Sequence, residues 1–180
     1  MTFSLGYLFL TYLIAMAAGS LMGYLGGKTD MLGLRLVEIW ANVPFLYMVI
    51  ILVSVMPGWW GVGWQVSSLL FIMVLFSWTG MTYYIRAAVY KEKARDYVSA
   101  AKVIGAGPLR IIFRHLLPNV ISTLVTFAPF TIAAAISSIT ALDFLGYGLP
   151  PPTPSWGELL KQAVGNLKTA PWIVISTVSA

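Results

Sequence analysis

Cysteine is absent from the sequence, and histidine occurs once, at His115. Without cysteine the chain has no disulfide framework, no thiolate metal site and no cysteine nucleophile. A single histidine, with no second ligand and no acidic partner in a known motif, does not make a metal site or a catalytic triad. We therefore predict no catalytic residue, no cofactor site and no metal site.

Charge is also scarce. Only 9% of the 180 residues are charged and 59% are hydrophobic, whereas a typical soluble domain is about 25% charged. This is too few charged residues to cover the surface of a soluble domain. We therefore expect lipid to be the main solvent. No polar linker divides the chain, which favours one membrane domain over residues 1–180.

Apolar runs recur along the chain and predict an all-α, polytopic transmembrane helical bundle. The first covers roughly 34 Å at 1.5 Å per residue, enough to cross a hydrocarbon core of about 30 Å. The second is weaker, since it takes in Glu38 and Asn42 near its cytoplasmic end. The fifth stops before it could cross, so we expect a fragment of a longer protein. The predicted spans are residues 3–25, 36–56, 66–85, 119–142 and 171–180.

Basic residues cluster between these runs. The net charge of +5 could indicate nucleic-acid binding, but the clustering favours the positive-inside rule of membrane proteins. Lys161 and Lys168 fall on one side of the membrane, and the other nine lie in the predicted loops on the opposite side, which we assign to the cytoplasm. These nine are Lys28, Arg35, Arg86, Lys91, Lys93, Arg95, Lys102, Arg110 and Arg114.

Several membrane residues have two readings. Ala15, Gly19, Gly23 and Gly27 repeat every four residues, which suits close helix packing against either this chain or a partner subunit. Asp143, at the outer end of the fourth span, either lines a solute pathway or caps the following turn. Pro129 either bends that span beside the pathway or is a structural kink.

The basic loop 86–118 contains the most informative segment. Residues 97–104 predict a short helix, Gly105 to Gly107 break it, and Pro108 suits the first turn of a second helix. We expect Gly105 to have a positive φ or to let another backbone approach closely. Pro118 is expected to separate the loop from the fourth span. The second helix would carry an amphipathic face of Leu109, Ile112, Phe113 and Leu116, able to rest on lipid headgroups or to enter a partner's groove.

Residues 96–119 resemble the EAA loop of bacterial ABC importer permeases. Ala100, Ala101, Gly105, Leu117 and Pro118 match that pattern at its spacing, whereas Ser99 and His115 depart from it. In the family this loop carries a coupling helix that sits in a groove of the ATPase subunit. The resemblance therefore implies a coupling site formed by Ala100, Ala101, Gly105, Pro108, Leu109, Ile112, Phe113, Leu117 and Pro118.

Two further segments narrow the resemblance. Residues 142–160 are similar to permeases of the dipeptide, oligopeptide and nickel class, and residues 35–55 are most similar to those of oligopeptide and microcin C importers. The resemblance implies a type I-like permease in the bacterial inner membrane, truncated here at both ends. It also implies ABC ATPase subunits, a second permease of related but different sequence, an extracytoplasmic solute-binding protein and no nucleic acid.

A non-ABC channel or an ion-coupled membrane transporter is the main alternative. Such a protein would be expected to carry an ionisable residue buried in the middle of a span, and the clean spans have none. A membrane enzyme is disfavoured because the sequence lacks a nucleophile–base pair and a metal-binding set.

Overall fold

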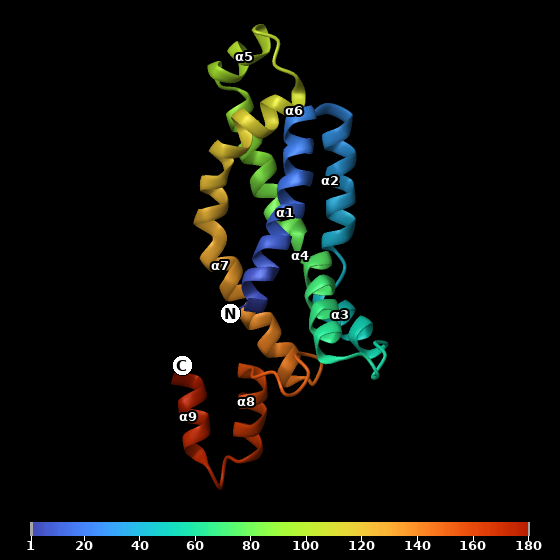
Figure 1. Ribbon diagram of the computed structural model, residues 1–180, viewed down its shortest axis with the longest axis vertical. Helices are drawn as coiled ribbons and strands as arrows, with labels where there is room; N and C mark the ends of the chain where they lie inside the picture. Colours follow the sequence, from blue (N-terminus) through green and yellow to red (C-terminus); the bar gives the residue numbers. More distant parts are fainter. Residues whose placement is uncertain (1, 180) are drawn as a thin grey trace.

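Three long helical segments form the bundle in the computed structural model, which describes residues 2–179 (Figure 1). They are α1 (Thr2–Leu25), α4 (Val62–Lys93) and the continuous stretch Pro108–Phe144. That stretch consists of α6 (Pro108–Arg110), the π-helical turn η1 (Ile111–Leu116) and α7 (Leu117–Phe144). Each segment is apolar and long enough to cross a membrane. Both α4 and the 108–144 stretch are longer than the predicted spans, because they extend into the loop 86–118.

Helices α1 and α4 pack closely through two of the small residues of α1. A Cβ on Gly19 would lie 2.8 Å from the Ile85 Cβ, and a Cβ on Gly23 would lie 2.9 Å from the Arg86 carbonyl oxygen. Ala15 is fully buried, whereas nothing lies within 4 Å of a Cβ on Gly27. The small-residue face therefore serves packing within this chain, and Gly27 is not part of it.

Two buried clusters hold the bundle together, one toward each end. The first joins α1, α4 and α7 to the loop through Val98, Ala101, Ile111, Ile112 and Leu116. The second lies toward the opposite end and includes Tyr7, Val49, Leu69, Met73, Val74, Ala135, Ile139 and Leu142.

The predicted second span, 36–56, is divided in the structure. It consists of α2 (Gly27–Ala41) and α3 (Phe45–Ser54), which are bent by 68° relative to each other. Pro44 lacks a backbone donor and disfavours the helical conformation of the residue before it, which accounts for the break. Trp40 fixes the end of α2, because its Nε1 donates to the Leu75 carbonyl oxygen at 2.7 Å and its ring stacks on Phe76.

A buried charge cluster ties the start of α2 to α4. Arg86 forms an ion pair with Asp30, and the Tyr90 hydroxyl donates to the same carboxylate at 2.9 Å. Gly26 and Gly27 make the tight turn before α2, with φ of 66° and 53°.

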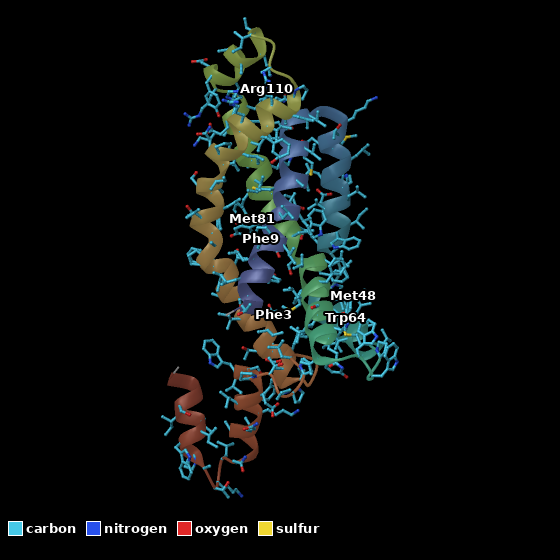
Figure 2. The ribbon with its side chains drawn as sticks, viewed as in Figure 1. Phe3, Phe9, Met48, Trp64, Met81 and Arg110 are labelled. Carbon is cyan, nitrogen blue, oxygen red and sulfur yellow. The ribbon has the colours of Figure 1, made fainter. Side chains whose placement is uncertain are left out.

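The loop that carries Arg110 and the turn before α2 lie at the opposite end of the molecule from Trp64 and the two C-terminal helices. The turn before α2 and the loop that carries α5 (Asp96–Val103) lie at one end, where Figure 2 labels Arg110. Trp64 lies toward the other end, as do α8 (Trp156–Gly165) and α9 (Pro171–Ser179). The predicted segment 171–180 is thus helical as far as Ser179, and Ala180 lies outside the described residues.

Candidate coupling loop

Helix α5 ends in a Schellman motif centred on Gly105. The Ala106 amide donates to the Ala101 carbonyl oxygen at 2.9 Å, and the Gly105 amide donates to that of Lys102 at 3.0 Å. These are the two hydrogen bonds of the motif, and they require a left-handed residue at Gly105. Its φ is 85°, and nothing lies within 4 Å of a Cβ placed there. The predicted positive φ is confirmed, whereas close approach of another backbone is not the reason for glycine.

The two alanines of the loop have different surroundings. Ala101 is buried in the same cluster as Val98, and this contact docks α5 on the bundle. Ala100, the preceding residue, is exposed. The spacing of Ala101 and Gly105 is therefore that of a helix anchored on one side and stopped after its last turn.

Pro118 does not end the helix, contrary to the prediction from sequence. The backbone runs without a break from α6, where Pro108 is the first residue, through η1 into α7. In the π-helical turn the Leu117 amide donates to the Ile112 carbonyl oxygen, five residues earlier. This wider turn lies directly before the proline, which has no amide proton for a regular helical bond. The Asn119 side chain donates to the His115 carbonyl oxygen at 2.7 Å.

The predicted amphipathic face is divided between the core and the surface. Ile112 and Leu116 are buried, together with Ile111. Leu109 and Phe113 are instead 67% and 66% exposed. The expectation of one face assumed regular α-helical spacing, which the π-helical turn alters.

Two apolar side chains at the end of α5 are exposed on the same loop as Leu109 and Phe113. Val103 is 87% exposed and Ile104 is 85% exposed. We call Val103, Ile104, Leu109 and Phe113 the coupling patch. Exposed apolar groups at the tip of a basic loop are typical of a surface that another protein covers.

A hydrogen-bond network in the loop joins α4, α5 and α7. The Tyr97 hydroxyl donates to Glu92 Oε2 at 2.9 Å, and Asn119 Nδ2 donates to the Tyr97 oxygen at 3.3 Å. Burial and the hydrogen bond to Glu92 raise the pKa of Tyr97, so its hydroxyl stays a donor. Periodicity did not predict this network, and the only signal was polar residues flanking the loop. A cavity of about 400 Å³ beside it is lined by Glu92, Arg95, Tyr97, Arg114, His115 and Asn119.

The other candidate residues lie apart from the loop. Asp143 is buried at the far end of α7, where its Oδ1 accepts from the Leu149 amide at 2.5 Å. The carboxylate therefore holds the turn after α7, as the capping interpretation expects. Pro129 lies inside α7 with an exposed ring. Among residues 2–179, no group of three His, Asp or Glu side chains is placed to hold a metal ion.

Curated relatives of this chain are described as permease proteins. It is 43% identical over 161 residues to the Agrobacterium fabrum protein "Peptidoglycan transport system permease protein YejE", covering 89% of this chain and 40% of the relative. For "Inner membrane ABC transporter permease protein YejE" of Escherichia coli K12, the identity is 44% over 160 residues, covering 88% and 45%. The Haemophilus influenzae "Oligopeptide transport system permease protein OppC" is 33% identical over 168 residues, covering 93% and 52%.

This chain thus spans about half the length of the curated relatives it matches, or less. Its helical composition and its membrane-spanning candidates place it among multi-pass proteins of the bacterial inner membrane. Residues 15–180 match the family described as "Binding-protein-dependent transport system inner membrane component". The match covers most of the sequence and all of the coupling loop, so the chain belongs to this family.

Proposed function

We propose that this chain is part of the permease subunit of an ATP-driven ABC importer, and that it forms half of a pathway for peptides or peptide-like solutes. The observation that supports this most directly is the coupling patch, an exposed apolar surface on a loop whose backbone is fixed by a Schellman motif. The family match and the description of the Haemophilus influenzae relative as an oligopeptide transport system permease protein support the same proposal.

In the proposed site the residues of the loop have three roles. Leu109 and Phe113 contact a groove of a separate ATPase subunit, together with Val103 and Ile104. Ala101, Ile112 and Leu117 pack inward, and Gly105, Pro108 and Pro118 shape the backbone. The chain supplies no chemistry of its own, so ATP hydrolysis takes place on the partner.

The helix geometry suggests how movement of the patch would reach the membrane. Leu109 and Phe113 lie on the same unbroken stretch of helix as α7. Tyr97 links this stretch to the ends of α4 and α5. A displacement of the patch by ATP-driven closure of the ATPase would therefore move α7 and α4 together, which is what a two-state transport cycle requires.

Other partners follow from the same proposal. An extracytoplasmic solute-binding protein would deliver the peptide, and a second permease of related but different sequence would complete the pathway. A non-ABC channel or an ion-coupled transporter would need no ATPase, so the coupling patch distinguishes these alternatives.

The test uses a strain lacking the full-length gene, complemented with variants at matched membrane abundance. We expect Leu109→Asp combined with Phe113→Asp to abolish ATPase co-purification and the uptake of short peptides, because charge opposes burial in an apolar groove. Val164→Asp is the matched control, since Val164 is 55% exposed on α8 at the opposite end. Retention of the ATPase by the double variant would refute the docking proposal. If the strain lacking the gene takes up peptides normally but has lost nickel or sugar uptake, the proposed substrate class is refuted.

A further inference from the structure

Helix α2 carries a polar stripe on an exposed face. Arg35 Nη1 donates to Glu38 Oε2 at 2.8 Å, and these side chains are 75% and 45% exposed. Asn42 is also exposed, and its Nδ2 donates to the Glu38 carbonyl oxygen at 2.7 Å. The three residues are spaced by three and four positions, which places them on one side of the helix.

The structure indicates that this stripe lies deeper in the membrane than the predicted span 36–56 implied, because α2 begins at Gly27, nine residues before that span. Helix α2 starts at the basic end of the bundle and runs back along α1 (Figure 1). At 1.5 Å per residue, Glu38 is about 17 Å from Gly27 along the helix axis, near the middle of a hydrocarbon core of about 30 Å. Trp40 gives an independent measure of depth, because it donates to Leu75, which is near the middle of the 32-residue helix α4.

The helix also ends at this depth, with the 68° bend at residues 42–44. Lipid provides no hydrogen bonds for an interrupted backbone and solvates charged side chains poorly. Such groups persist at membrane depth where they face protein or a water-filled cavity. Leu36 is also 67% exposed, but it lies on the other side of the helix, roughly 160° around the axis from Glu38, and suits lipid instead. Helix α2 therefore presents two exposed faces that suit different solvents.

We propose that Arg35, Glu38 and Asn42, together with the bend, line the water-filled solute pathway and bind the charged ends of a short peptide. This inference rests on the proposed function. The Arg35 guanidinium matches a peptide carboxylate, the Glu38 carboxylate matches a peptide ammonium group, and the Asn42 amide can bind a peptide bond. With no solute bound, the two charged groups neutralise each other, so a zwitterionic peptide would exchange one ion pair for two.

Accessibility is tested first, in the full-length subunit within its assembled transporter. Residues 1–180 have no cysteine, so single cysteines at Glu38 and Asn42 report only their own positions once any cysteines elsewhere in the transporter are replaced. We expect a membrane-impermeant thiol reagent to label both, and a transported peptide to protect both. A cysteine at Leu36, on the other side of the helix, is the matched control and should stay unlabelled. Absence of labelling at Glu38 and Asn42 would mean that lipid or the second permease covers this face, which overturns the inference.

Substrate recognition is tested with peptides whose termini are blocked. We expect Arg35→Leu to raise the KM for a free tripeptide about tenfold, the effect of losing one charge-assisted hydrogen bond, while the KM for its C-terminal amide changes little. We expect Glu38→Leu to act in the same way on the free amino group, with the N-acetylated peptide as its control. Equal KM values for wild type and both variants would overturn the inference while leaving peptide transport intact. Failure of the wild type to transport any peptide would instead refute the proposed function.

Discussion

Gly105 and Gly107 are two glycines of one turn with different requirements. Gly105 has a φ of 85°, in the left-handed region that most side chains avoid, and it closes the Schellman motif. Gly107 has a φ of −71°, which any residue can adopt. Nothing lies within 4 Å of a Cβ on either. Both glycines therefore have room for a side chain, and the backbone conformation alone predicts which of them can be replaced.

We predict that Gly105→Val strains the turn by about 1–3 kcal/mol and disconnects Val103 and Ile104 from the second half of the coupling patch. The variant should reach the membrane at normal levels but lose ATPase co-purification and transport together. Gly107→Val is the matched control and should keep both. Gly105→Asn should recover part of the activity, because asparagine tolerates positive φ. Normal ATPase association of Gly105→Val would contradict this role for Gly105.

At the scale of elements, regular periodicity found the helices but not their interruptions. The apolar face of residues 109–116 was drawn with α-helical spacing, and the π-helical turn before Pro118 sends Leu109 and Phe113 to the surface. Pro118 was the available signal in the sequence, because a proline changes the backbone hydrogen bonding of a helix without having to end it. Local sequence patterns do not encode long-range contacts such as the hydrogen bond from Trp40 to Leu75.

The ion pair of Asp30 and Arg86 is the main polar tie between α2 and α4, and it predicts a stability effect. The two side chains are only 11% and 24% exposed, so removing one charge leaves the other poorly solvated. We expect Arg86→Met and Asp30→Asn each to destabilise the subunit by about 2–3 kcal/mol.

Thermal unfolding of the full-length subunit in detergent measures this effect. The double variant should be more stable than the sum of the single effects predicts, because neither charge is then left without its partner. Arg95→Met is the matched control. Its ion pair with Glu92 has a 55% exposed arginine and should contribute less than about 1 kcal/mol. Additive single effects would show that the two residues act independently.

For the whole molecule, charge distribution predicted the orientation, and helix packing brings the predicted loops together. The turn before α2 and the loop of α5 are far apart in sequence, yet both lie at the end that carries Arg110 (Figures 1 and 2). The Lys93 side chain contacts α1 at this end by donating to the Tyr24 carbonyl oxygen at 2.5 Å. Arg35 is the exception among the nine basic residues, because α2 carries it away from this end. Counting charges by loop could not show its depth.

The arrangement predicts which residues react from each side of the membrane. Lys91 and Lys102 lie toward the basic end, and Gly61 and Thr153 lie in the turns of the opposite end. In the full-length subunit, single cysteines at Lys91 and Lys102 should react with an impermeant reagent only when the cytoplasmic face is open to it. Cysteines at Gly61 and Thr153 should react in intact spheroplasts. All four positions are exposed or half-buried, so burial within the chain does not explain a failure to react. Labelling of both pairs from one side would contradict the topology, because α4 and the 108–144 stretch would then not each cross the membrane.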